Sequence, residues 1–116
     1  MSDIQIYHNP RCSKSRQTLA LLQEQGLQPR IIEYIKTPPT TKVLTEVLAQ
    51  LDFSARDLLR KGEAVYKELN LADKSLTDQQ LIEAMIAHPK LIERPIVIHN
   101  GKAKIGRPPE SVLELL

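Results

Sequence analysis

The residues that could do chemistry in this sequence gather around its single cysteine, Cys12. Arg11, Lys14 and Arg16 flank it, and residues 7–23 include no acidic side chain. Neighbouring positive charges favour the thiolate and can bring a cysteine pKa from about 8.5 down to roughly 3.5–7.5. The pattern therefore predicts a reactive thiolate. The alternative is that Cys12 is a small buried apolar residue, as many unpaired cysteines are.

The elements expected on either side of Cys12 strengthen this prediction. Residues 4–7 alternate apolar and polar β-formers and predict a strand, which Asn9-Pro10 ends. Over residues 13–26 the apolar side chains recur at helical spacing up to a terminal glycine. Cys12 would then lie at a helix N-terminus, where unpaired N–H groups favour an anion. His8, just before the break, could add a proton donor or a further positive charge.

Having only one cysteine limits the possible chemistry. The chain cannot form an internal disulfide, so any disulfide chemistry must take its second thiol from another molecule. His8, His88 and His99 do not combine with the cysteine in a ligand spacing, so no structural zinc is expected. The phosphatase signature of a cysteine followed six positions later by an arginine also fails, because Thr18 occupies that position.

Composition bounds the class of protein. The chain has 116 residues, enough for one domain with its own core, and a formal charge of +2, which does not by itself call for a nucleic-acid partner. No apolar run approaches the roughly 20 residues of a membrane span, and the N-terminus does not resemble a signal peptide. We therefore expect a cytoplasmic protein that binds neither membranes nor nucleic acid.

The middle of the chain is predicted to be helical. Thr40 or Thr41 can cap a first helix, Ser54 precedes a second piece, and residues 64–69 look like a third. Thr77 begins a capping box, T-x-x-Q, which opens a helix that ends before Pro89.

Strands are expected on both sides of this helical stretch. Residues 30–34 predict a strand, so the first half reads β-α-β, which suggests parallel pairing. Residues 95–99 and 102–105 predict a β-hairpin through Asn100-Gly101, and a last helix follows over residues 110–116. The order predicts an α/β, thioredoxin-like fold: a mixed four-stranded sheet flanked by helices, in a single domain over residues 1–116 with a helical insertion at roughly 40–90.

Three arginines stand at boundaries between these elements: Arg60, Arg94 and Arg107. Guanidinium groups bind tetrahedral oxyanions through paired hydrogen bonds, and several together would hold a doubly charged one. In a thioredoxin-like sheet the loop before the third strand lies near the cysteine turn, so Arg94 can reach it. Sequence spacing alone does not bring the three together. The alternative is that they are surface arginines in weak ion pairs.

Five blocks along nearly the whole chain resemble the glutaredoxin-linked, ArsC-like arsenate reductases of bacteria: IYHNPRCSKSR, TPPT, LLRKGE, ERPIVI and GRPPE. The ordered set is more specific than any one block. The resemblance implies a thioredoxin-like fold with a helical insert, and reduction of arsenate to arsenite with glutathione as co-substrate, glutaredoxin as partner and no bound cofactor. It also raises the expectation of a cis bond before Pro95.

The resemblance also implies roles for individual residues. Cys12 matches the nucleophile, His8 the histidine that helps to ionise it, and Ser15 the serine near the sulfur. Ser15 falls one helical turn after the cysteine, where its hydroxyl can donate to the thiolate but cannot form a disulfide. The oxyanion-binding arginines of the family are matched by Arg60, Arg94 and Arg107.

Two other functions remain open at this level. The same superfamily includes Spx-like regulators that bind RNA polymerase, which typically carry a C-x-x-C switch; here Ser15 takes the second position. The other is a glutathione-dependent thiol oxidoreductase with a different substrate. The turn from Arg11 to Ser15 is more basic than the Ala-Cys-Gly-Thr-Ser turn of the resistance-operon enzymes, which leaves the physiological substrate open.

Overall fold

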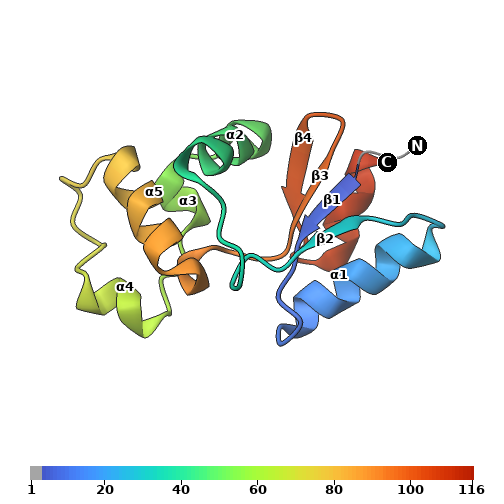
Figure 1. The fold of residues 1–116 in the computed structure, drawn as a ribbon, viewed down its shortest axis with the longest axis horizontal. Coiled ribbons are helices and arrows are strands. Elements are labelled where there is room, and N and C mark those ends of the chain that lie inside the picture. The colour runs from blue at the N-terminus through green and yellow to red at the C-terminus, as the bar shows by residue number, and fades with distance from the viewer. Residues whose placement is uncertain (1–3) are drawn as a thin grey trace. The chain divides into compact units, whose positions relative to one another are not determined.

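The computed structural model describes residues 4–116 and divides the chain into two compact units. The sheet unit consists of the chain up to Thr37 together with Arg94–Leu116, and the helical unit is Pro38–Glu93. Figure 1 shows the elements of both units.

The sheet unit is built on four strands: β1 (Ile4–Tyr7), β2 (Arg30–Ile32), β3 (Ile96–His99) and β4 (Lys102–Ile105). Their order is β2-β1-β3-β4, with β1 and β2 parallel and the other neighbours antiparallel. The mixed four-stranded sheet predicted from the sequence is therefore confirmed. The hairpin turn is confirmed as well, because Asn100 and Gly101 both have the positive φ that a type I′ turn needs, 53° and 78°.

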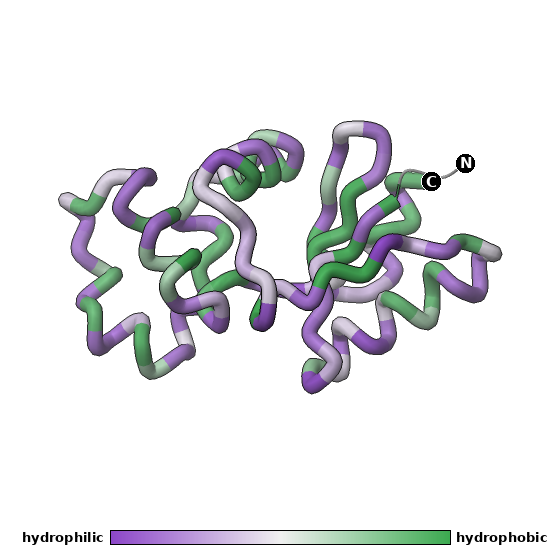
Figure 2. The backbone as a smooth tube through the Cα atoms, in the orientation of Figure 1, coloured by the Kyte–Doolittle hydropathy of each residue, from purple (hydrophilic) through white to green (hydrophobic). Residues whose placement is uncertain are grey.

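Two helical elements complete this unit, α1 (Ser13–Glu24) and the 3₁₀ helix η2 (Pro109–Leu115), which packs against both α1 and β4. Five buried apolar residues join strands and helices in one core: Ile4, Ile6, Leu22, Val97 and Val112. Figure 2 shows hydrophobic residues on the strands and along part of α1. The core thus fixes α1, and with it the cysteine turn, on the sheet.

The helical unit contains α2 (Thr41–Leu51), α3 (Ala55–Leu58), α4 (Ala64–Glu68), α5 (Asp78–Ala87) and the 3₁₀ helix η1 (Pro89–Leu91). Helix α5 packs against α2, α3 and η1. Leucines supply most of its interior, and Leu44, Leu58, Leu81 and Met85 are almost completely buried.

The helix starts expected from the sequence are confirmed. Thr40 caps α2, its Oγ1 accepting a hydrogen bond from the Val43 N–H at 3.2 Å. Ser54 and Thr77 both open capping boxes, and the Gln80 side chain accepts from the Thr77 N–H at 2.8 Å. These local bonds satisfy the first backbone N–H groups of each helix, which is why short polar residues mark the starts so reliably.

Two strand boundaries, the type of the last helix and one short additional helix differ from the prediction. Strand β2 ends at Ile32 instead of residue 34, because the Lys36 and Thr37 N–H groups turn back to the Glu33 carbonyl. Strand β3 begins after Pro95, which has no N–H for the ladder. The final helix is 3₁₀ with i to i+3 bonds, and η1 was not predicted.

Among the helices of residues 4–116, none combines the length and apolar character needed to cross a membrane.

Candidate active site

Cys12 is the residue immediately before α1, with extended backbone angles (φ −95°, ψ 122°). Its N–H donates to the Asn9 carbonyl at 3.0 Å, and its own carbonyl accepts from the Arg16 N–H at 3.0 Å. The Asn9 side chain holds the same turn by accepting from the Arg11 N–H at 3.0 Å. The thiol is partly exposed. It is therefore not the buried apolar cysteine of the alternative interpretation.

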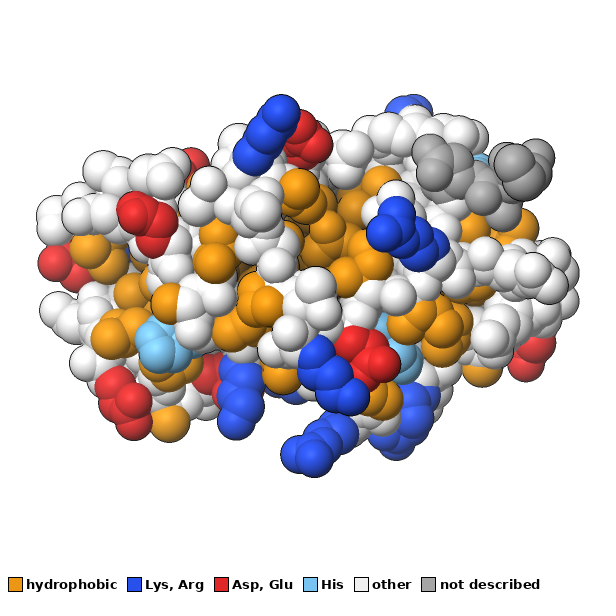
Figure 3. Space-filling model, viewed as in Figure 1, with side chains coloured by type: hydrophobic (Ala, Val, Ile, Leu, Met, Phe, Trp, Pro, Cys, Tyr) orange, Lys and Arg blue, Asp and Glu red, His pale blue; other side chains and the backbone are white. Residues whose placement is uncertain are grey.

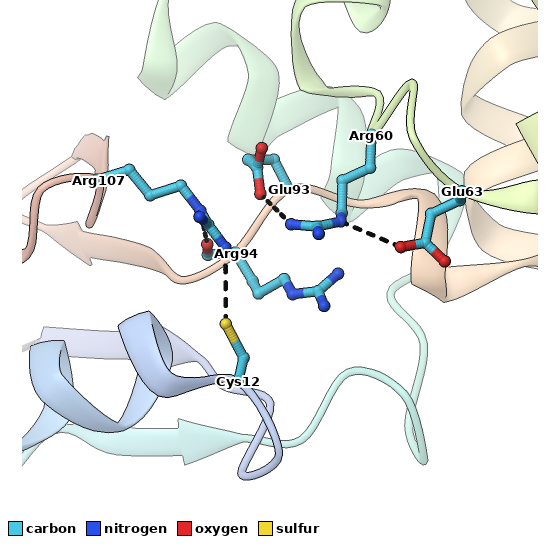
Figure 4. Close-up of polar contacts among 6 residues, drawn as sticks. All are labelled: Cys12, Arg60, Glu63, Glu93, Arg94 and Arg107. Carbon is cyan, nitrogen blue, oxygen red and sulfur yellow. Dashed lines mark hydrogen bonds and ion pairs between the residues drawn. The ribbon is translucent and has the colours of Figure 1, made fainter.

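The surroundings of the sulfur lower its pKa. Partial burial alone would raise the pKa of Cys12, but the Ser15 N–H, the Arg94 guanidinium and the Lys14 N–H together hold it below its ordinary value. Arg107 adds a contact, since its Nη2 donates to the Cys12 sulfur at 3.6 Å (Figure 4). Backbone donors at a helix start and two guanidinium groups thus act on one sulfur atom.

The two arginines are carried by neighbouring segments of the sheet unit. Arg107 Nε donates to the Arg94 carbonyl at 2.9 Å, as Figure 4 shows, and the Gly106 N–H donates to the Pro95 carbonyl at 3.0 Å. The peptide bonds Arg94-Pro95 and Arg107-Pro108 are both cis. The first of these agrees with the expectation from the resemblance, whereas the second was not expected.

His8 and Ser15 form a buried pair beneath the cysteine turn. His8 Nδ1 lies 2.7 Å from Ser15 Oγ, which also accepts from the Asn9 N–H at 3.0 Å. Burial chiefly lowers the pKa of His8, with Arg16 acting in the same direction and Glu33 opposing them. A lowered pKa favours the neutral ring, which argues against a further positive charge at this position.

Ser15 differs from expectation in the atom that acts. Its hydroxyl contacts His8 and Asn9, and it is the Ser15 backbone N–H that hydrogen-bonds the cysteine sulfur. The sequence analysis considered the Ser15 hydroxyl as a donor to the thiolate, and in the structure this hydroxyl bonds His8 and Asn9. The position of Ser15 in the first turn of α1 could have indicated the backbone contact, because the first N–H groups of a helix lack partners within the helix.

Arg60 belongs to the helical unit and is paired there with two carboxylates. Its Nη1 donates to Glu93 Oε1 at 2.6 Å and its Nε to Glu63 Oε2 at 3.4 Å (Figure 4). Burial would lower the pKa of Arg60, but both carboxylates raise it above its usual value. Neither acidic residue was predicted from the sequence as part of the site. The three-residue spacing to Glu63 could have indicated one contact, whereas nothing local connects Arg60 to Glu93.

The sheet unit therefore brings together Cys12, His8, Ser15, Arg94 and Arg107, and Arg60 stands in the other unit. A thiolate beside two guanidinium groups combines a nucleophile with donors for an oxyanion. Within residues 4–116, no group of three or more His, Cys, Asp or Glu residues is placed to hold a metal ion. On the face shown in Figure 3, positive and negative side chains both occur.

A comparison with protein families decides the class. The model of the ArsC family matches residues 7–115. This chain belongs to the ArsC family. Among ArsC relatives with curated names, it is 57% identical over 97% of its length to the uncharacterized protein YfgD of Escherichia coli K12, covering 96% of that protein. It is 47% identical over its full length to the arsenate reductase of the same strain, covering 82% of it.

Solved structures agree with this assignment. The chain superimposes on the arsenate reductase from Vibrio cholerae with a TM-score of 0.96 and 54% identity, over 97% of each chain. The thioredoxin-like fold that the sequence predicted is thereby confirmed, together with the family that carries the quoted motifs.

Proposed function

We propose that this protein reduces arsenate to arsenite, with Cys12 as the nucleophile. The observation that carries the proposal is the Cys12 sulfur with a lowered pKa, held within reach of the Arg94 and Arg107 guanidinium groups. The 47% identity to an E. coli arsenate reductase and the match to the ArsC family support the choice of arsenate as the oxyanion. A thiolate attacks arsenic well, and guanidinium groups stabilise the charge on the oxygens as the sulfur approaches.

The proposed reaction uses two thiols for one two-electron reduction. The Cys12 thiolate attacks arsenic, a sulfur–arsenic bond forms, and one arsenate oxygen leaves as water after protonation. The glutathione thiol then adds across an arsenic–oxygen double bond, its sulfur bonding arsenic and its proton going to that oxygen, which gives a species with cysteine, arsenic and glutathione joined. Arsenic takes two electrons and leaves as arsenite, while the two sulfurs end as a mixed disulfide, which glutaredoxin reduces by thiol exchange.

Individual residues have distinct parts in this scheme. Arg94 and Arg107 would hold the arsenate oxygens, since both act on the sulfur that must approach arsenic. The buried pair of His8 and Ser15 would support the cysteine turn and handle a proton. Arg60 joins them as a third oxyanion ligand on the strength of the family resemblance, and its two carboxylate partners would have to share it with the substrate.

The reductant in this proposal is external. Cys12 is the only cysteine, so the chain cannot supply the second thiol, and we assign that part to glutathione and a glutaredoxin without a bound cofactor. A reducing compartment keeps such thiols available, and we therefore place the protein in the cytoplasm.

The test is steady-state arsenate reduction by the purified protein with glutathione, glutaredoxin, glutathione reductase and NADPH, followed as loss of NADPH. We expect arsenate-dependent turnover that the Cys12→Ser variant lacks, because the variant keeps the volume of the side chain but loses the nucleophile. Appreciable turnover by the variant contradicts the covalent scheme. An inactive protein whose Cys12 still alkylates rapidly at neutral pH would have a genuine thiolate and a different substrate.

A further inference from the structure

Gly106 lies where three segments of the candidate site meet, and it is buried. A methyl group built on this glycine would lie 2.8 Å from Pro95 Cγ and 3.0 Å from Thr18 Cγ2, and it would overlap Thr18 Oγ1. All of these are shorter than ordinary van der Waals contacts. The glycine has no positive φ to explain its presence, so the close approach of its neighbours is what requires it.

Each neighbour of Gly106 leads directly to a functional side chain. Thr18 belongs to α1, the helix that Cys12 precedes, and its hydroxyl is fixed by donating to the Lys14 carbonyl at 2.8 Å. Pro95 follows Arg94 in the chain, and its carbonyl accepts the Gly106 N–H at 3.0 Å. Arg107 follows Gly106 itself and donates through Nε to the Arg94 carbonyl.

We propose that Gly106 is a positioning residue: its missing side chain lets α1 pack against the Arg94-Pro95 and Gly106-Arg107 segments closely enough for the guanidinium of Arg107 to reach the Cys12 sulfur. The inference rests on the proposed function in one respect, because the guanidinium groups that approach the sulfur are the ones proposed to bind the substrate. The contact of 3.6 Å between Arg107 Nη2 and Cys12 Sγ is what the glycine controls.

A methyl group at position 106 would have to move one of its neighbours. Thr18 cannot turn away freely, because its hydroxyl is bonded to its own helix, and Pro95 is a rigid ring. The segments must therefore separate, which lengthens the path from the guanidinium groups to the sulfur. Since interaction between charges falls with distance, the thiolate loses part of its stabilisation.

The experiment measures the rate at which iodoacetamide alkylates Cys12 as a function of pH, which reports the thiolate fraction of the only cysteine in the chain. For Gly106→Ala we expect the midpoint to rise by about half to one pH unit, so that alkylation below the midpoint slows about three- to ten-fold. Adding Thr18→Ala to Gly106→Ala removes two of the three close contacts, so the midpoint of this double variant should move part of the way back to the wild-type value.

Two controls separate positioning from general stability. Gly62→Ala adds the same methyl group where nothing lies within 4 Å, and it should leave the midpoint unchanged. Val112→Ala removes methyl groups from the core of the sheet unit, and it should lower the melting temperature without moving the midpoint. A Gly106→Ala variant that loses stability as Val112→Ala does, but keeps the wild-type midpoint, overturns the proposal.

The design holds even if the single variant does not fold. The comparison is then between Thr18→Ala and the double variant Thr18→Ala, Gly106→Ala. In the double variant the close contact with Pro95 Cγ remains, so we expect its alkylation midpoint to be higher than that of Thr18→Ala. Equal midpoints overturn the proposal. Alkylation needs no arsenate, so a wild-type protein that fails to reduce arsenate would refute the proposed function and leave this result standing.

Discussion

At the scale of single residues, opposing effects determine the pKa of Cys12. Partial burial favours the neutral thiol, and the backbone N–H groups of Ser15 and Lys14 with the guanidinium of Arg94 favour the thiolate. The second set wins, so the pKa lies below its ordinary value. Because donors from backbone and side chain contribute together, removing any single side chain should weaken the thiolate without abolishing it.

The arginines beside the sulfur should affect turnover more than they affect the thiol. We expect Arg94→Ala to lower kcat/KM for arsenate by a factor that corresponds to about 2–4 kcal/mol of lost transition-state stabilisation, as for the loss of one oxyanion donor. The control is Arg30→Ala, which removes an exposed arginine from β2. Steady-state kinetics with both variants decide the matter, and an unchanged kcat/KM in Arg94→Ala would remove this arginine from the substrate site.

Ser15 allows its hydroxyl and its backbone to be separated. Ser15→Ala keeps the N–H that contacts the sulfur but leaves the Asn9 N–H and His8 Nδ1 without their buried acceptor or donor. We expect the alkylation midpoint of Cys12 to stay close to wild type, while the free energy of unfolding falls by about 1–3 kcal/mol. A large rise in the midpoint would mean that the hydroxyl donates to the thiolate after all.

At the scale of elements, what the sequence predicted well is what short-range chemistry determines. Strand β1, the cap at Thr40 and the box at Thr77 depend on residues within a few positions of one another, and all three are confirmed. The type I′ turn at Asn100-Gly101 is of the same kind. The contacts that were missed join distant segments. Nothing in the sequence pairs Arg60 with Glu93, or places Gly106 against Thr18.

The capping box of α5 gives a prediction for the helical unit. Thr77→Ala removes the oxygen that accepts the Gln80 N–H, so the free energy of unfolding should fall by about 1 kcal/mol. The control is Gln79→Ala at an exposed position of the same helix, which should change stability by less than about 0.5 kcal/mol. Chemical denaturation of both variants measures the difference. Equal values would show that the cap contributes nothing to this helix.

At the scale of the whole molecule, the candidate chemistry depends on how the chain is divided. The sheet unit is assembled from the two ends of the sequence, and residues 38–93 form the helical unit between them. Cys12 and Arg107 therefore come from opposite ends of the chain and meet only when the unit folds. For the same reason, stability of the sheet unit and reactivity of the thiol should respond together to conditions that disturb its buried polar groups.

His8 is the buried polar group through which pH should act on the stability of the fold. Its pKa is lowered in the folded protein, chiefly by burial, so below a pH of about 6.5 the unfolded chain binds a proton that the folded chain resists. The free energy of unfolding should therefore fall as the pH decreases from about 6.5, by at most about 1.4 kcal/mol per pH unit, until the folded pKa is passed.

The His8→Gln variant should lose this part of the pH dependence, because glutamine does not titrate, even if its stability at neutral pH is lower. The measurement is chemical denaturation of both proteins at a series of pH values from neutral to mildly acidic, compared as slopes and not as absolute stabilities. Replacement of the exposed His88 by glutamine controls for the loss of one imidazole. If His8→Gln and wild type show the same slope, His8 is not the group that couples folding to pH, and its burial beside Ser15 has no consequence for protonation.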